Sequence, residues 1–262
     1  MDLAAQLRIA ERVCEDAERL FLDGLGAGPS QWKGSGDFAT DVDVAIEEVL
    51  RERLEDLSGI PVYGEEQGGT LASEAVWVVD PIDGTANYSV QNPLCAILIS
   101  LLVDGEPVLG LTSFPTLSRR LAAYEGSPLF VNGEPATRLP SGEGRSGQVG
   151  FSSVASQQSS SFPSLVRQGL LGDLTGTFLR PRITGSVGVD LGFCAQGIFS
   201  GAVSFSPHVW DNAAGIVLNR AAGSLITDTR GEPWTLHSEG CVVGSPEAHE
   251  AIMTTIRSVL KA

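Results

Sequence analysis

The sequence predicts a mixed fold with an α+β first half and an α/β second half. Two helical patterns precede a series of strand patterns that ends at about residue 135. Helix and strand patterns alternate from about residue 148 onwards, which is typical of α/β proteins. Between them, residues 136–164 are dominated by Ser and Gly. We therefore place a boundary near residue 140, which divides the chain into segments 1–140 and 141–262.

Helical periodicity opens the first half. Apolar residues recur at spacings of three and four over residues 3–22, and a second helix is predicted over 41–57. Asp41 and Asp43 lie at the N-terminal end of that second helix, where the helix dipole favours negative charge. The Gly-rich stretch between the two helices is predicted to be a loop. Strands are predicted at 60–66 and 75–80, as a long hairpin at 95–115 that turns at Asp104–Gly105, and as two short strands within 119–135.

Strands and helices alternate through the second half. The predicted strands lie near 148–153, 201–206 and 224–228, and the predicted helices lie at about 162–171, 186–197, 211–222 and 246–260. Since 42% of the 262 residues are hydrophobic, the chain can bury a substantial core.

The charge balance limits the partners of the chain. Lys and Arg number 17 against 32 Asp and Glu, which gives a formal net charge of −15. Such a chain would be repelled by nucleic acid and by anionic lipid, so we expect neither as a partner. It could bind an anionic substrate only if local positive charge is supplied, and bound divalent cations would supply it.

The cysteines and the apolar runs indicate a reducing, aqueous compartment. Cys14, Cys95, Cys194 and Cys241 are scattered without a CxxC pair, which favours reduced, buried thiols and a cytoplasmic location. The N-terminal residues carry charges throughout, unlike a signal peptide. No apolar run reaches the length of about 18 residues that a membrane span needs, so no membrane association is expected.

Four carboxylates stand at the ends of predicted elements. Glu65 and Asp80 each end a strand, Asp83 lies in the turn after the second of these strands, and Asp211 begins a helix. If these ends converge, the like charges need protons or cations to share one pocket. Hard oxygen ligands of this kind suit Mg²⁺, which often shares its coordination with phosphate.

The turn after Asp80 adds the features of an anion site. Its sequence is DPIDGT, in which Gly84 permits a ligand to approach the backbone closely. Gly84 and Thr85 could present N–H groups at the start of a helix, where anions bind well. Simpler interpretations stay open for each signal: Asp211 as a helix N-cap, the Asp-Gly pair as an ordinary turn, and Glu65–Glu66 as a solvated edge.

Four segments together resemble the inositol monophosphatase family. They are DFATDVDVAIE, GEEQGG, WVVDPIDGTANY and WDNAAGIVLNRAAG, and they occur in the family's order across nearly the whole chain. This family comprises magnesium-dependent, lithium-sensitive phosphatases, and the segments are most similar to its actinobacterial inositol-1-monophosphatase branch. The resemblance implies a layered αβαβα sandwich and a homodimer.

The resemblance also implies a metal site and a set of catalytic groups. The metal ligands would be Glu65, Asp80, the backbone carbonyl of Ile82, Asp83 and Asp211, holding two or three Mg²⁺ ions with Asp80 as a bridge. Glu65, Asp43 and Thr85 would be catalytic, the last two orienting the attacking water. The amides of Gly84 and Thr85 would bind the phosphate, and Lys33 falls near a family lysine.

The substrate wall is less typical of the family. By resemblance, Asp83, Gly185, Ser186, Val187, Ser204 and Asp211 would contact the substrate. Ser204 stands where many inositol phosphatases carry a glutamate that contacts substrate hydroxyls, and a neighbouring acidic position is Ser200. These departures leave the phosphate chemistry intact but weaken the expectation of an inositol substrate.

The function we expect is the hydrolysis of inositol 1-phosphate, or of a similar small polyol phosphate, by metal-activated water. No Cys or Ser nucleophile stands in a recognisable arrangement, and His208, His237 and His249 lie outside any phosphohistidine motif. The alternatives in the same superfamily are phosphatases for histidinol phosphate, fructose 1,6-bisphosphate or 3′-phosphoadenosine 5′-phosphate. A non-catalytic metal-binding protein and an acidic structural module are further alternatives.

Overall fold

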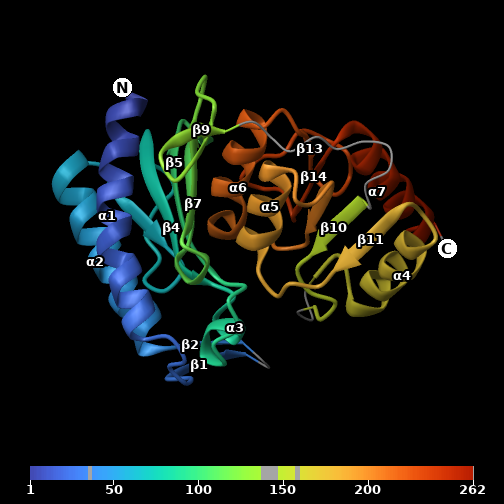
Figure 1. Cartoon of the computed structure of the whole chain (residues 1–262), viewed down its shortest axis with the longest axis horizontal. Helices are drawn as coiled ribbons and strands as arrows, with labels where there is room; N and C mark the ends of the chain where they lie inside the picture. The colour runs from blue at the N-terminus through green and yellow to red at the C-terminus, as the bar shows by residue number, and fades with distance from the viewer. Residues whose placement is uncertain (35–36, 137–146, 157–159, 262) are drawn as a thin grey trace.

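Five layers of helices and sheets make up the fold (Figure 1). The computed structural model describes residues 1–34, 37–136, 147–156 and 160–261. Helices α1 (Leu3–Asp23) and α2 (Asp41–Ser58) cover a seven-stranded sheet, and α5 (Val187–Gln196) and α6 (Val209–Ala221) separate it from a five-stranded sheet. Helices α4 (Ser164–Thr175) and α7 (Pro246–Val259) cover the far face of that second sheet. The predicted αβαβα layering is therefore confirmed.

The first sheet runs in the order β3-β4-β5-β6-β7-β8-β9, and all its pairs are antiparallel except β3 with β4. The hairpin turn at Asp104–Gly105 is confirmed, and both residues have positive φ angles, of 49° and 80°. The bounds of the strands are β3 Val62–Gly64, β4 Ala75–Asp83, β5 Ala96–Val103, β6 Glu106–Phe114, β7 Arg119–Tyr124, β8 Leu129–Val131 and β9 Glu134–Ala136. Two short helical segments, α3 (Thr85–Ser89) and η1 (Pro115–Leu117), follow β4 and β6.

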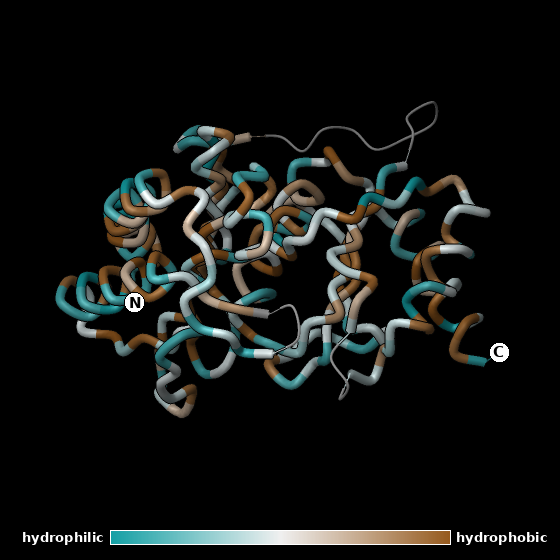
Figure 2. Tube along the Cα trace, turned by 90° about the horizontal axis from the view of Figure 1, so that it is seen from below, coloured by the Kyte–Doolittle hydropathy of each residue, from teal (hydrophilic) through white to brown (hydrophobic). Residues whose placement is uncertain are grey.

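Strand β4 is apolar because both of its faces are buried. Trp77 and Val79 pack in a core with α1 and α2, whereas Val76 and Val78 pack in a second core that includes α5 and α6. A strand buried on both sides needs a continuous apolar run instead of an alternating one. The outer helices α1 and α2 carry both polar and apolar positions, as Figure 2 shows, because each buries only one face.

The second sheet runs in the order β11-β10-β12-β14-β13. Its predicted strands are present, but the sequence analysis missed β11 and β14. The edge strand β11 contains Pro181, which breaks a strand pattern, and β14 is only four residues long. The bounds are β10 Gly147–Phe151, β11 Leu179–Arg182, β12 Gly201–Ser204, β13 Leu225–Thr227 and β14 Cys241–Gly244.

Two further expectations need correction. The Gly-rich stretch after α1 was expected to be a loop, but it contains a hairpin of β1 (Gln31–Gly34) and β2 (Asp37–Ala39). Helix α6 begins at Val209, two residues before the predicted start, because only its N-cap His208 keeps extended backbone angles, with a φ of −86° and a ψ of 132°. The predicted boundary near residue 140 lies outside the described residues.

Asn87 connects the two halves of the chain. Asn87 Nδ2 donates to the carbonyl oxygen of Leu94 at 2.6 Å and to that of Thr184 at 2.8 Å. These bonds join the segment after β4 to the segment before α5. Within the described part of the chain, no helix is both long and apolar enough to cross a membrane.

Candidate active site

Strand β4 brings Asp80 and Asp83 to the same side of the first sheet. In a regular strand these residues would point to opposite faces, because side chains alternate. Asp80 pairs with Leu98 and Asp83 with Ala96, so β4 holds one more residue than β5 between the two pairs. This bulge turns Ile82 into the core with α1 and α2 and directs Asp83 towards α5. Asp83 therefore ends β4, whereas we had placed it in the following turn.

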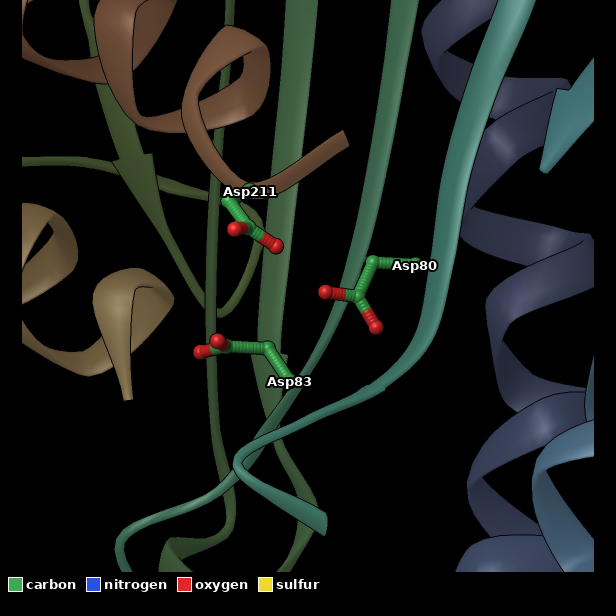
Figure 3. A group of neighbouring side chains, drawn as sticks. All are labelled: Asp80, Asp83 and Asp211. Atoms are coloured by element: carbon green, nitrogen blue, oxygen red, sulfur yellow. The ribbon is translucent and has the colours of Figure 1, made fainter. Parts of the chain in front are cut away.

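Asp211 joins these two carboxylates from the second half of the chain. It lies in the first turn of α6, and Figure 3 shows its side chain pointing towards those of Asp80 and Asp83. One carboxylate oxygen from each residue lies within 4.8 Å of the others. All three line a cavity of about 600 Å³. Residues 128 positions apart in the chain thus share one acidic cluster.

The acidic cluster fits a cation. Burial, and then the negative charge of Glu65, raises the pKa of Asp80 well above its usual value. Burial followed by the charge of Asp83 has the same effect on the pKa of Asp211, and burial raises the pKa of Asp83 to about 6. Asp80 Oδ1 is buried and has no hydrogen-bond partner among the residues that the structure describes. A divalent cation would supply that partner and remove the repulsion among the carboxylates.

Asp83 is held by the N-terminus of α5. Its carboxylate accepts hydrogen bonds from the backbone N–H of Val187 at 3.2 Å, from that of Gly188 at 2.7 Å and from the hydroxyl of Ser186. These donors orient the carboxylate and favour its charged form. Ser186 was predicted to contact substrate, but its side chain is buried and bonded to Asp83, while Gly185 and Val187 line the cavity.

Glu65 and Lys33 form the rim of the cavity. Lys33 Nζ lies 2.7 Å from Glu65 Oε1 and 2.6 Å from Glu66 Oε1. Burial raises the pKa of Glu65, and the charge of Lys33 opposes that rise. The predicted ligand Glu65 therefore enters the cavity already paired with a cation.

Glu47 supports the turn that carries Glu65, and the sequence analysis missed it. Its buried carboxylate accepts from the backbone N–H of Glu66 at 2.7 Å and from that of Gln67 at 2.8 Å. A Cβ atom at Gly64 would lie 2.3 Å from the Glu47 side chain, so only glycine fits there. Nothing in the helical pattern of α2 distinguishes this glutamate from its solvated neighbours.

Replacing Glu47 by Gln should loosen this turn. The amide would direct an N–H group at a backbone N–H, so one buried hydrogen bond would be lost at a cost of about 1–3 kcal/mol in the free energy of unfolding. We expect a lower Tm by thermal melting, together with lower phosphatase turnover. A Glu48→Gln variant is the control, because Glu48 is an exposed neighbour on the same helix. Equal melting of the Glu47→Gln variant and the native chain would contradict this role.

Thr85 and Asp43 lie together as the resemblance implied. Thr85 Oγ1 is 3.2 Å from Asp43 Oδ1 and 3.0 Å from the carbonyl oxygen of Ile82. Asp43 also closes a capping box with Thr40 at the start of α2, and burial raises the pKa of Asp43. Gly84 has a φ of 85°, which glycine adopts without strain. It is the N-cap of α3, whose first residue is Thr85.

The cavity lining includes some of the residues predicted to contact substrate and leaves out others. Ser204 is buried on β12, and the cavity is lined instead by the residues that follow it, including Phe205 and Ser206. His208 and Trp210 also line it, and their rings stack with centroids 4.4 Å apart. The segment 136–164, whose Ser and Gly content led us to place a boundary in it, also contributes serines to the lining, namely Ser152, Ser153, Ser160 and Ser161. The amino-acid composition of this segment did not indicate that it lines the cavity.

Comparisons with known proteins agree with this geometry. The inositol monophosphatase family matches residues 2–261. A probable inositol 1-monophosphatase, ImpA, of Mycobacterium tuberculosis is 43% identical over 95% of this chain and 93% of its own. A histidinol-phosphatase of the same organism is 35% identical, with 84% of each chain covered. The crystal structure of the suppressor protein suhB from Bartonella henselae superposes with a TM-score of 0.87 at 21% identity, covering 97% of this chain and 98% of the other.

The acidic cluster and these similarities lead to one assignment. The expected resemblance to the actinobacterial branch is confirmed by the mycobacterial relative. The family is metal-dependent, and three carboxylates of this chain could hold a metal ion. The chain therefore belongs to the inositol monophosphatase family and is a phosphatase that acts on a small phosphorylated substrate.

Proposed function

We propose that the chain hydrolyses inositol 1-phosphate, or a similar small polyol phosphate, in a Mg²⁺-dependent reaction. The observation that carries the proposal is the cluster of Asp80, Asp83 and Asp211, in which Asp80 Oδ1 is buried and unpartnered. The similarity to a protein described as a probable inositol 1-monophosphatase supports the substrate class. The volume of the cavity, about 600 Å³, suits a small phosphorylated ring.

The metal-holding groups we propose are Glu65, Asp80, the carbonyl of Ile82, Asp83 and Asp211, for two or three ions. Bound Mg²⁺ supplies positive charge at the phosphate and activates water for attack. The chain itself contributes fixed positions for these oxygens: the bulge in β4 sets Asp80 and Asp83, and the N-terminus of α5 orients Asp83.

Two groups of the chain would handle water and phosphate. The Thr85 hydroxyl, paired with Asp43, would orient the attacking water, and Glu65 of the same cavity would be the third catalytic group. The backbone N–H groups of Gly84 and Thr85 would bind phosphate oxygens. Gly185 and Val187 would contact the alcohol portion beside Asp83 and Asp211, with Ser186 and Ser204 behind them.

Thr85→Ala should lower kcat about a hundredfold, because the hydroxyl is proposed to orient the attacking water. The free energy of unfolding should change by less than about 1.5 kcal/mol, the net value of a typical hydrogen bond. Steady-state kinetics and a thermal melt measure the two effects. Thr254→Ala is the control, since that hydroxyl is exposed and its partners among the described residues are Glu250 and Arg257 of the same helix, α7. A large drop in Tm with unchanged kcat would mean that the hydroxyl is structural.

A panel of phosphate esters tests the substrate. Release of inorganic phosphate would be measured for inositol 1-phosphate, histidinol phosphate, fructose 1,6-bisphosphate and 3′-phosphoadenosine 5′-phosphate, each with Mg²⁺ and with a chelator. We expect the highest kcat/KM with inositol 1-phosphate. Preference for histidinol phosphate would favour the second candidate, to which the 35% identical relative and the aromatic pair of His208 and Trp210 point. Metal binding without turnover of any ester would favour a non-catalytic protein.

We further propose a cytoplasmic homodimer. The four cysteines are free and buried, which is consistent with a reducing compartment. Light scattering of the purified chain would measure the mass, and a single-chain mass at working concentration would contradict the dimer.

A further inference from the structure

The Ser-rich side of the cavity consists of two short pieces of chain. One comprises residues 152–156 and the other residues 160–162. Ser152 is tied to the segment that precedes α5, since its carbonyl oxygen accepts from the Gly185 N–H at 2.9 Å. Neither piece belongs to a helix or strand beyond the end of β10, so side-chain contacts must fix their positions.

Arg167 of α4 bonds to both pieces. Its Nε donates to the carbonyl of Phe162 at 2.8 Å, and its Nη1 donates to the carbonyl of Ala155 at 2.6 Å and to that of Ser153 at 3.3 Å. Its Nη2 donates to the hydroxyl of Ser160 at 3.1 Å. The planar fork of a guanidinium can reach several acceptors at once, which a lysine cannot do.

Aromatic rings pack against the guanidinium of Arg167 and fix its position. Its Cζ lies 4.8 Å from the centroid of the Phe205 ring. Phe205 packs in turn against Phe151 and Phe162, at centroid distances of 5.2 and 5.1 Å. Arg167 is 7% exposed, and its partners among the described residues are carbonyl and hydroxyl oxygens and a ring. A buried cation without an acidic partner is costly, so this one must provide something that an apolar residue would not.

A second tie fixes the first piece independently of Arg167. The backbone N–H of Ser164, at the start of α4, donates to Ser156 Oγ at 2.8 Å. The backbone N–H of Ser156 donates to Ser164 Oγ at 3.0 Å. Helix α4 thus holds the wall through Ser164 and through Arg167.

We propose that Arg167 is a positioning residue that sets the substrate range, because it holds the two pieces of wall against which the leaving alcohol binds. The inference rests on the proposed function. Arg167 lies on the Ser-rich side, and the acidic cluster is held by β4, α5 and α6. Arg167 should therefore affect the binding of those substrates that are large enough to reach the wall.

Arg167→Lys tests the inference with two substrates of different size. With inositol 1-phosphate, KM should rise about tenfold while kcat changes less than about twofold. With glycerol 2-phosphate, which is too small to fill the wall, both constants should stay within about twofold of the native values. A merely structural role would lower the active fraction and reduce kcat equally for both substrates.

Two further variants complete the test. Arg182→Lys is the matched control, because Arg182 is exposed and its guanidinium bonds, within the described part of the chain, to the carbonyls of Arg180 and Pro181 in its own strand. Ser156→Ala weakens the second tie, because it removes the bond to Ser156 Oγ and keeps the one from the Ser156 backbone N–H to Ser164 Oγ. This variant should raise KM for inositol 1-phosphate in the same selective way, even if the Arg167 variant fails to fold. If the native chain is active, and both variants keep its ratio of KM for inositol 1-phosphate to KM for glycerol 2-phosphate, this inference alone would be overturned. A native chain inactive on both esters would overturn the proposed function as well.

Discussion

Asp80→Asn should lower turnover about a thousandfold or more, as expected when a central electrostatic group of an active site is lost. The same substitution should leave the metal-free fold as stable as before or more stable. Asp80 is buried, its Oδ1 has no partner, and neighbouring carboxylates repel its charge. An amide removes that repulsion, so loss of activity and gain of stability should occur together.

The measurement combines steady-state kinetics with thermal melts in chelator and in Mg²⁺. The native chain should melt at a higher temperature in Mg²⁺ than in chelator, and the Asp80→Asn variant should lose most of that difference. Asp173→Asn is the control, since Asp173 is an exposed carboxylate on α4. Near-native turnover of the Asp80 variant, or an undiminished Mg²⁺ shift, would show that Asp80 holds no metal.

Mg²⁺ should stabilise the chain more at neutral pH than at acidic pH. Burial raises the pKa of Asp83 to about 6, and the pKa values of Asp80 and Asp211 are raised above normal as well. In chelator, the folded state therefore binds more protons than the unfolded state above about pH 4, the usual carboxyl pKa. The free energy of unfolding should then fall as the pH rises from about 4 through about 6. Mg²⁺ requires the charged forms, so its stabilisation should grow over the same range.

Melting temperatures at about pH 5, 6 and 7.5, with and without Mg²⁺, measure this effect. At a Mg²⁺ concentration a hundred times the Kd, the stabilisation should reach about 2.7 kcal/mol. The Asp80→Asn variant should show a flatter dependence in chelator, because one repelled carboxyl is missing. A Tm in chelator that rises steadily across this range would contradict the raised pKa values.

The elements with strong local signals could be predicted from the sequence. Helices α1 and α2 show clear periodicity, and the β5–β6 hairpin carries an Asp-Gly turn. The convergence of Asp80, Asp83 and Asp211 followed from their places at the ends of elements. That the structure gathers these three does not by itself test their role as ligands, which stays a prediction.

The rest depended on contacts between distant residues. The bulge that reorients Asp83 is defined only by the register with β5, and Glu47 meets its partners across 19 and 20 residues. The need for glycine at position 150 also comes from a distant residue, because a Cβ atom there would lie 2.6 Å from Asp190 of α5. The Ser-rich wall carries no periodicity, so its composition indicated only a boundary between the two halves, although its serines line the cavity.

The separation of the acidic cluster from the Ser-rich wall has an evolutionary consequence. Substitutions in residues 152–156 and 160–162 would alter the surface that we propose meets the alcohol, while the aspartates on β4 and α6 keep their own supports. Selection can therefore act on substrate choice and on bond cleavage separately. Such a scaffold can give rise to descendants that dephosphorylate different metabolites with one unchanged set of aspartates.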